Sequence, residues 1–167
     1  MKLYAHTFTT PAGRMLAAVD ERGRLVRLEF LTQHRRERIV AALERAGHTV
    51  EWKEEPCAPV VAQIGDYFAG ERQAFDLEIA PEGTPFQRQV WRQLGKIPYG
   101  ETRSYGEIAA RLGRPKGARA AGGAIGSNPI VVVIPCHRVI GADGSLTGFG
   151  SGLPVKRKLL RLEGVLP

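Results

Sequence analysis

Alternating apolar and polar residues predict short strands in the first part of the chain. The alternation runs through residues 3–8, 14–19 and 24–31, and a turn at residues 20–23 (DERG) separates the second run from the third. A period of two is typical of strands that bury one face. We therefore expect these three runs to form a β-meander.

A helical period follows the predicted meander. Apolar residues recur at helical spacing within residues 33–46, and Gly47 is a stop signal for that helix. A second helix is expected over residues 60–68. Residues 75–79 return to the alternating pattern and predict a half-buried strand, and residues 80–83 are the expected linker to the rest of the chain.

The second half of the chain is predicted to be mainly helical. Residues 84–87 (TPFQ) and residues 104–107 (SYGE) each have the capping-box sequence that opens a helix. Another helix should cover about residues 115–127, and a last one should run from Pro154 to Gly164. The second and third of these helices form a candidate helix-turn-helix, which taken alone is a weak indication of DNA binding.

Length and cysteine content limit the class of protein. A chain of 167 residues can form one domain or two small ones, each with its own apolar core. Two cysteines, Cys57 and Cys136, are too few for a disulfide framework, and no stretch has the character of a signal segment or a membrane span. We expect a protein of the reducing cytoplasm with no membrane association.

The net charge of +7 is unevenly distributed along the chain. Residues 1–83 carry 11 Lys and Arg against 13 Asp and Glu, whereas residues 84–167 carry 13 against 4. All of the excess positive charge therefore belongs to the second half. Such an asymmetry favours a polyanionic partner, most often nucleic acid, and the alternative is a basic surface kept only for solubility.

Residues 134–139 (IPCHRV) combine a thiol, a potential base and a cation. Cys136 follows an apolar run, residues 131–134, that is predicted to be a strand, and His137 and Arg138 come directly after it. A free thiol has a pKa of about 8.5, so a cysteine nucleophile needs a neighbouring base or cation to ionise at neutral pH. The alternative is a small buried hydrophobe, which is the usual role of an unpaired cysteine beside apolar residues.

The helix expected over residues 115–127 is poor by intrinsic propensity. It contains four glycines, and each costs about 1 kcal/mol relative to alanine. Either the helix packs closely on its own core, or its outer face lies against another smooth surface such as a DNA minor groove. Arg119 is the one long side chain in the middle of this face, and its ordinary role would be a contact to phosphate.

A series of short motifs, in order, extends from Gly83 to Gly164. Beside PCHRV and the preceding GSNP, the chain has TPFQ, VW, IPYG and SY between residues 84 and 105, and KRKLLRLEG at residues 156–164. With these motifs the chain resembles the O6-alkylguanine-DNA alkyltransferases, also called methylated-DNA–protein-cysteine methyltransferases. The N-terminal half matches them only in size and general pattern.

The resemblance implies an α+β fold with two domains. Residues 1–80 would form a ribonuclease-H-like antiparallel sheet with helices, and residues 81–167 a mainly helical DNA-binding domain with the helix-turn-helix. It also implies direct repair of DNA, by irreversible, single-use transfer of the alkyl group from O6-alkylguanine to Cys136. Whether O4-alkylthymine is also a substrate is left open.

The resemblance assigns roles to residues around the thiol. Glu163 would orient His137, and His137 would take the thiol proton through a water molecule. Asn128 would brace the bend between the recognition helix and the cysteine strand. Tyr105 would help to turn the nucleotide and would donate its hydroxyl to the extruded guanine.

The resemblance also implies how DNA is bound. The small-residue helix would enter the minor groove of double-stranded DNA that contains alkylated guanine, and Arg119 would fill the space left by the extruded nucleotide. The same helix would contact DNA through Lys116, Gly117, Ala118 and Ala120. The alkylguanine pocket would be lined by Tyr105, Cys136, Val139, Phe149, Gly150 and Ser151.

At two pocket positions the chain departs from the family pattern. Phe149 stands where tyrosine is usual, so any hydrogen bond from that hydroxyl is lost, and Ser151 stands where glycine is very common. No cofactor is expected. No metal site is expected either, because the cysteine and histidines of the N-terminal half have no recognisable ligand spacing; they are Cys57, His6, His34 and His48.

The expected assembly is a monomer, with cooperative clustering on DNA left open. Two other functions also remain open on sequence alone. A non-catalytic protein that recognises alkylated DNA and recruits other repair factors is one, although alkyltransferase-like proteins of that kind lack the cysteine. A cysteine hydrolase built on Cys136 and His137 is the other, and it would explain neither the basic second half nor the glycine-rich helix.

Overall fold

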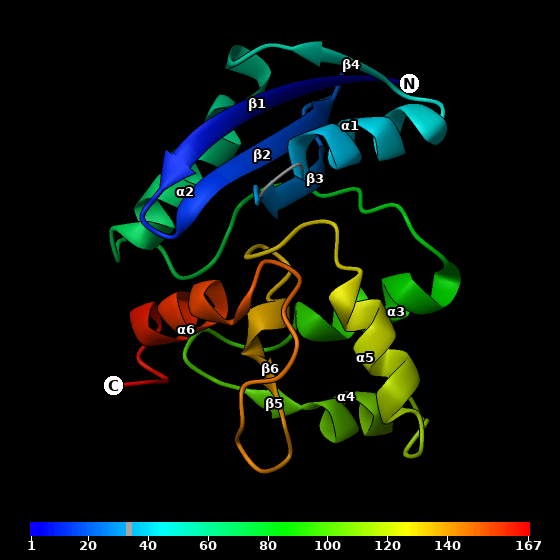
Figure 1. Cartoon of the computed structure of the whole chain (residues 1–167), viewed down its shortest axis with the longest axis vertical. Coiled ribbons are helices and arrows are strands. Elements are labelled where there is room, and N and C mark those ends of the chain that lie inside the picture. Colours follow the sequence, from blue (N-terminus) through cyan, green and yellow to red (C-terminus); the bar gives the residue numbers. More distant parts are fainter. Residues whose placement is uncertain (33–34) are drawn as a thin grey trace. The chain divides into compact units, whose positions relative to one another are not determined.

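The computed structural model describes residues 1–32 and 35–167 and divides the chain into two compact units, Met1–Pro81 and Glu82–Pro167 (Figure 1). The first unit contains the strands β1 (Lys2–Thr10), β2 (Gly13–Asp20), β3 (Leu25–Phe30) and β4 (Thr49–Trp52), the helices α1 (Arg35–Arg45) and α2 (Ala58–Phe68), and a 3₁₀ turn, η1 (Glu55–Cys57). The expected mixture of a sheet with helices is therefore confirmed for this part of the chain.

The sheet of the first unit has the strand order β3-β2-β1-β4. The predicted meander is confirmed, because β1 pairs antiparallel with β2 and β2 pairs antiparallel with β3. The fourth strand, β4, pairs parallel with β1 and was not predicted from the sequence. It is only four residues long and mostly exposed, so its alternation of polar and apolar residues (TVEW) is too short to indicate a strand by itself.

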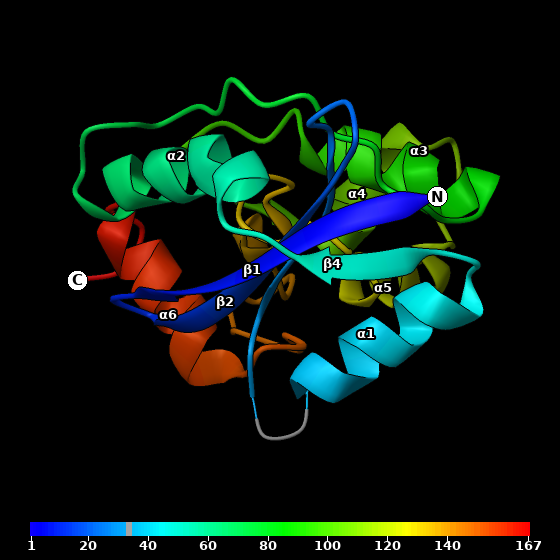
Figure 2. The ribbon, with the colours of Figure 1, turned by 90° about the horizontal axis from the view of Figure 1, so that it is seen from above.

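Helix α1 packs on the sheet through the two residues that it buries, Ile39 and Leu43. They belong to one apolar cluster with strand residues, namely Leu3, Ala5, Leu16, Ala18 and Val26. The predicted helix over residues 33–46 is thus confirmed for residues 35–45, while residues 33 and 34 lie outside the described residues. In the view of Figure 2, α1 and α2 lie on either side of β1.

The prediction of a strand at residues 75–79 is wrong, because this segment forms no strand. Only Ile79 makes a bridge, to Leu25, through backbone hydrogen bonds of 2.9 and 2.8 Å that flank it. Earlier in the segment, the backbone of Asp76 is bound by the side-chain amide of Gln63. This amide donates to the Asp76 carbonyl and accepts from the Asp76 N–H, both at 2.9 Å. Because a side chain satisfies this backbone, the segment needs no strand partner there.

The second unit is mainly helical, as expected. It contains α3 (Pro85–Leu94), α4 (Tyr105–Arg111), α5 (Ala118–Gly126), α6 (Leu153–Leu162), the 3₁₀ turn η2 (Cys136–Arg138) and a small parallel pair formed by β5 (Arg103–Ser104) and β6 (Val139–Ile140). Both predicted capping boxes are confirmed, with Thr84 and Gln87 opening α3 and with Ser104 and Glu107 opening α4.

The glycine-rich helix α5 is shorter than predicted and begins at Ala118 rather than near residue 115. Gly117 has φ −95° and ψ 18°, outside the helical range, and its N–H donates to the carbonyl of Arg114 at 2.7 Å, which closes a turn. Helices α4 and α5 pack against each other across this turn, as Figure 1 shows. Within residues 1–32 and 35–167 no helix has the length and apolarity needed to cross a membrane.

Candidate active site and DNA-binding helix

The segment that carries the cysteine is a tight turn and not the strand predicted for residues 131–134. The N–H of Val133 donates to the carbonyl of Val131 at 2.9 Å, which forces Val132 to a φ of 73°. A β-branched residue in this region is a strained exception. Such strain persists only where the surroundings fix the backbone, and here a neighbouring side chain does so.

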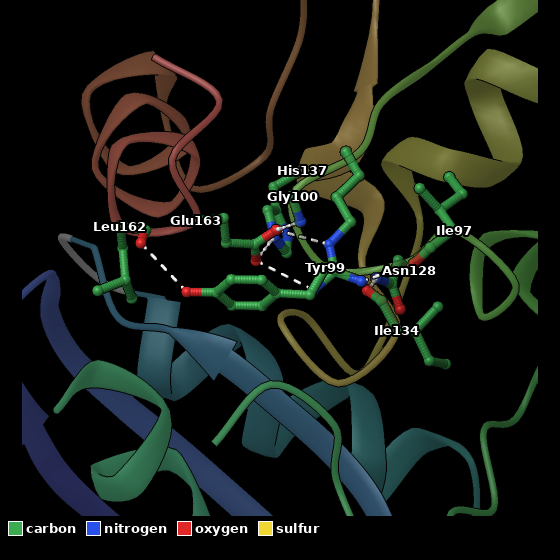
Figure 3. Close-up of polar contacts among 9 residues, drawn as sticks. Ile97, Tyr99, Gly100, Asn128, Ile134, His137, Leu162 and Glu163 are labelled. Atoms are coloured by element: carbon green, nitrogen blue, oxygen red, sulfur yellow. Dashed lines mark hydrogen bonds and ion pairs between the residues drawn. The ribbon is translucent and has the colours of Figure 1, made fainter. Parts of the chain in front are cut away.

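Asn128 fixes this turn with both ends of its amide. Its Oδ1 accepts from the N–H of Ile130 at 3.0 Å. Its Nδ2 donates to the carbonyl of Ile134 at 2.8 Å, as Figure 3 shows. Asn128 is buried, so each of these bonds satisfies a backbone group that water does not reach. The predicted bracing contact between the end of α5 and the cysteine segment is therefore present in the structure.

Cys136 is the first residue of η2 and is 5% exposed. Its N–H donates to the carbonyl of Ile134 at 2.8 Å, so the residue follows directly from the segment that Asn128 holds. A buried thiol is protected from random oxidation, and it reacts only if its surroundings help it to lose a proton. The neighbouring side chains decide that point.

His137, the residue after Cys136, forms a buried pair with Glu163. The Nε2 atom of His137 lies 2.7 Å from Oε2 of Glu163, and both side chains are fully buried (Figure 3). Glu163 is the residue directly after α6. The contact therefore joins the segment with the PCHRV motif to the end of the KRKLLRLEG motif. The other ring nitrogen, Nδ1, is buried with no hydrogen-bond partner among the described residues.

Burial lowers the pKa of His137 from its usual value of 6.5. The Glu163 carboxylate acts in the opposite direction, and the positive charges of Arg138 and Lys156 assist the lowering. We conclude that the imidazole is neutral at pH 7, with one nitrogen held by Glu163. A neutral imidazole fixed by a carboxylate is the state in which histidine can accept a proton.

The main partner of Arg138 is the Glu163 carboxylate and not the thiol. Its guanidinium donates to Oε1 and Oε2 of Glu163 at 2.8 and 3.1 Å, and to the carbonyl of Ile97 at 2.7 Å. The ring of Tyr99 lies 5.8 Å from the guanidinium carbon, and the Tyr99 hydroxyl donates to the carbonyl of Leu162. Sequence reasoning offered Arg138 as a cation for the thiol and missed this ion pair.

Lys156 is a second functional candidate that sequence reasoning missed. Its ammonium group is fully buried and donates to the carbonyls of Val139, at 2.6 Å, and Thr147, at 2.9 Å. Burial lowers the pKa of Lys156, and a negative charge on Cys136 would raise it, so this cation lies close enough to the thiol to interact with it. The signal was available, because Lys156 shares the buried face of α6 with Leu159 and Leu160.

The loop before α6 is tied to the predicted pocket residue Tyr105. The Tyr105 hydroxyl donates to the carbonyl of Thr147 at 3.2 Å, the same carbonyl that Lys156 binds. Of the other predicted pocket residues, Val139 and Ser151 are buried, Phe149 is half-buried and Gly150 is exposed. Fixed hydrogen bonds therefore hold the start of this loop and the side chain of Tyr105 together.

The predicted DNA-contacting residues lie around the beginning of α5. Lys116, Arg119 and Ala120 are exposed, and Gly117 and Ala118 are half-buried. Helix α5 is also held to α3, because the indole N–H of Trp91 donates to the carbonyl of Ala124 at 2.9 Å. The exposed cations Lys116 and Arg119 thus lie at the beginning of α5, whereas Cys136, His137 and Glu163 are buried.

The glycines of α5 are not explained by tight packing within the protein. A Cβ atom added at Gly123 or Gly126 would meet nothing within 4 Å, and one added at Gly122 would make only an ordinary contact of 3.7 Å with the Tyr105 ring. Of the two explanations that the sequence left open, close internal packing is excluded at Gly123 and Gly126. An outer surface kept smooth for a partner remains.

No group of three or more His, Cys, Asp and Glu side chains that could hold a metal ion occurs among residues 1–32 and 35–167. Of the N-terminal residues considered as ligands, His34 lies outside the described residues. Cys57 is buried on the sheet, and its Sγ donates to the carbonyls of Tyr4 and Ala17 at 3.5 and 3.7 Å. His48 contacts the N-terminal amine at 3.2 Å.

Two domain models match nearly the whole chain. Residues 3–81 match the ribonuclease-like domain of 6-O-methylguanine DNA methyltransferase, and residues 85–165 match the DNA binding domain described under the same name. The methylated-DNA–protein-cysteine methyltransferase of Methanosarcina acetivorans is 48% identical over 162 residues, which cover 97% of this chain and 99% of that protein. The protein of the same name from Mycolicibacterium paratuberculosis is 53% identical over 141 residues, covering 80% and 86%.

Solved structures agree with these sequence matches. The crystal structure of Mycobacterium tuberculosis OGT in complex with DNA superposes with a TM-score of 0.82 at 42% identity, covering 98% of this chain and 95% of that one. The O6-methylguanine-DNA methyltransferase of Pyrococcus kodakaraensis superposes with a TM-score of 0.65 at 28% identity, covering 98% and 99%. The fold class expected from the sequence is therefore confirmed.

Proposed function

The chain belongs to the 6-O-methylguanine DNA methyltransferase family, and from this we infer that it repairs alkylated DNA by transferring the alkyl group from O6 of guanine to one of its own cysteines. It is thus a methyltransferase that binds DNA. We propose Cys136 as the acceptor. The observation that carries this proposal is the buried contact of His137, the residue directly after Cys136, with Glu163.

The second cysteine supports the choice by contrast. Burial raises the pKa of Cys57 to about 11, so almost none of it is ionised at neutral pH. Its Sγ faces backbone carbonyls of β1 and β2, which accept from a thiol and do not remove its proton. Cys136, in contrast, has a neutral imidazole at the next residue and the Lys156 ammonium nearby.

The proposed reaction is a single displacement at carbon. His137 takes the thiol proton, through a water molecule or directly, and Glu163 holds the imidazole in the orientation that permits it. The Cys136 thiolate attacks the alkyl carbon, the S–C bond forms, and the C–O6 bond breaks with its electron pair left on the guanine. The proton that His137 took from the thiol finally passes to the guanine ring. The net reaction therefore converts thiol and O6-alkylguanine to thioether and guanine.

Tyr105 is proposed to assist the leaving group. A hydroxyl that donates to the departing guanine lowers the energy of the negative charge that develops there. In the free protein this hydroxyl donates to Thr147, so it would change partner when the base enters. Asn128 is proposed to fix the position of Cys136, and Val139, Phe149, Gly150 and Ser151 to line the pocket.

The product explains why the protein acts once. An S-alkyl cysteine is a thioether and has no acyl carbon that water could attack, in contrast to the intermediate of a cysteine hydrolase. A cysteine hydrolase is not favoured, because the chain belongs to a methyltransferase family. The non-catalytic recognition protein is not favoured either, because the close relatives are named as methyltransferases and Cys136 is present.

We propose that DNA is bound through its minor groove by α5. Gly123 and Gly126 are exposed and leave a smooth surface on this helix. At its beginning, Lys116 would contact phosphate and Arg119 would fill the space left by an extruded nucleotide. Ala118, Ala120 and Gly117 would lie against the sugar–phosphate walls. We further propose that the protein acts as a monomer in the cytoplasm, where reducing conditions keep Cys136 as a thiol.

The proposal is tested by separating transfer from binding. His137→Phe and Cys136→Ser should both bind a duplex containing O6-methylguanine with an affinity close to that of the unchanged protein. Cys136→Ser should transfer no methyl group, and His137→Phe should transfer it about 10²- to 10⁴-fold more slowly, the usual range for a lost proton acceptor. Equal losses of binding and transfer in His137→Phe would mark His137 as a structural residue.

A further inference from the structure

The Glu163 carboxylate has two strong donors in one buried site. His137 occupies Oε2 at 2.7 Å, while the Arg138 guanidinium spans both oxygens at 2.8 and 3.1 Å. The N–H of Gly100 adds a longer contact to Oε1 at 3.4 Å. A carboxylate bound in this way cannot rotate without breaking several charge-assisted hydrogen bonds.

Arg138 is itself fixed by a third acceptor. Its Nη1 donates to the carbonyl of Ile97 at 2.7 Å, and the Tyr99 ring lies against the guanidinium. The residue is 6% exposed, so the guanidinium lies in a site that water scarcely reaches. A buried carboxylate needs such a partner to stay ionised, because burial alone favours its neutral form.

We propose that Arg138 is a positioning residue for alkyl transfer, which keeps Glu163 ionised and holds it as the hydrogen-bond acceptor of His137. The proposal rests on the proposed function of Cys136. In it, Arg138 supplies a permanent positive charge to the group that receives the thiol proton. When His137 takes the thiol proton, the group of Arg138, Glu163 and His137 changes from neutral to a net charge of +1, next to the new thiolate. Without Arg138 the same proton transfer would leave a neutral group beside the thiolate.

Several charged and titratable groups of the described residues lie around this site. They are Cys136, His137 and Arg138 from η2, Glu163 and Lys156 from α6 and its end, and Tyr99 from the segment after α3. Lys156 contacts the carbonyls of Val139 and Thr147 and does not bind Glu163 in the described contacts. Arg138 is thus a cation that binds the carboxylate directly, through both of its oxygens.

The test measures the reactivity of the thiol without DNA. Carbamidomethylation of the Cys136 peptide by iodoacetamide is followed by mass spectrometry from pH 5 to pH 10, in the full-length protein and in Arg138→Met, Arg138→Lys and Arg157→Met. Arg157 lies exposed on α6, so Arg157→Met is a matched control that removes the same charge from the surface of the protein. The thiolate is the reacting form, so the midpoint of each profile reports its stability.

We expect Arg138→Met to move the midpoint upward by about one pH unit, which makes the reaction at pH 7 about tenfold slower while the rate at high pH is unchanged. Arg138→Lys keeps the charge without the bidentate contact and should give a smaller shift in the same direction, whereas Arg157→Met should give none. The same rank order is expected for methyl transfer from O6-methylguanine in duplex DNA.

A uniform loss of rate at every pH, or an unchanged midpoint in both Arg138 variants, would overturn the proposal and leave Arg138 as a purely structural residue. If Arg138→Met does not fold, Arg138→Lys decides by the same criterion. Failure of the proposed function gives a different result: the unchanged protein would transfer no methyl group, whatever the midpoints of the thiol profiles.

Discussion

The ammonium group of Lys156 donates a 2.6 Å hydrogen bond to the carbonyl of Val139, three residues after Cys136. This contact joins α6 to the strand that follows the cysteine turn. The same ammonium binds the carbonyl of Thr147, at the start of the loop that contains Phe149, Gly150 and Ser151. One buried cation therefore holds two sides of the proposed pocket.

Removal of this cation should loosen the pocket. Lys156→Met keeps the length of the side chain but leaves both carbonyls without their donor, so residues 147–152 should exchange their amide hydrogens faster. Methyl transfer should slow by roughly 10- to 100-fold, because small displacements of reacting groups are costly, while DNA affinity is retained. Lys158→Met, which alters an exposed lysine of the same helix, is the control. Equal transfer rates in the two variants would contradict this role.

Stability should fall on acidification because His137 is buried in its neutral form. Its folded-state pKa is lower than the unfolded value of 6.5, so below about pH 6.5 the unfolded chain binds a proton that the folded chain does not. The free energy of unfolding should therefore decrease as pH falls through this range, by at most about 1.4 kcal/mol per pH unit from this group. Urea unfolding at pH 7.5 and at pH 5.5 measures this change in the free energy of unfolding.

The control for this prediction is His137→Gln, which has no titrating group at that position. The difference in unfolding free energy between the two pH values should be smaller in His137→Gln than in the unchanged protein. An equal difference in both proteins would show that other groups cause the acid sensitivity.

Arg119 should matter only when a base has to leave the duplex. Arg119→Ala should slow repair of O6-methylguanine in duplex DNA by roughly 10- to 100-fold, since extrusion costs a few kcal/mol, and should leave the reaction with free O6-alkylguanine base unchanged. Arg88→Ala removes an exposed arginine from α3 and serves as the control for lost charge. Matching losses on both substrates would point to a folding defect in Arg119→Ala.

Ser151 should limit the size of the alkyl group. The residue is buried next to the N-cap of α6, and its hydroxymethyl group takes space that glycine would leave empty. Overfilling a packed site costs roughly 1–3 kcal/mol, so O6-benzylguanine should inactivate Ser151→Gly faster than the unchanged protein, with similar methyl repair by both. Residual activity against time checks this, and identical inactivation would place Ser151 outside the alkyl pocket.

The sequence predicted the helices of the second unit best, because their signals are local. Thr84 with Gln87 and Ser104 with Glu107 bond within one helical turn, and the structure contains both capping boxes. The motif around Cys136 likewise identified the family. It could not reveal the turn at Val132, since four consecutive apolar residues have the same pattern in a strand and in a buried turn.

Features that depend on distant residues were missed for a common reason. The pairing of β4 with β1, and the contact of Gln63 with Asp76 that replaced the expected strand, depend on which segments meet in space. The ion pair of Arg138 with Glu163 joins residues 25 positions apart. The family resemblance predicted the contact of Glu163 with His137, but it assigned no role to the second donor, Arg138.

The central claim is that Cys136 accepts the alkyl group, and the masses of the intact protein and its peptides after incubation with an O6-methylguanine oligonucleotide test it most directly. The account predicts one added methyl group per protein molecule, located on the peptide with Cys136 and absent from the peptide with Cys57, together with unmodified guanine in the DNA. A methyl group on any other residue, or repair of more lesions than there are protein molecules, would contradict it.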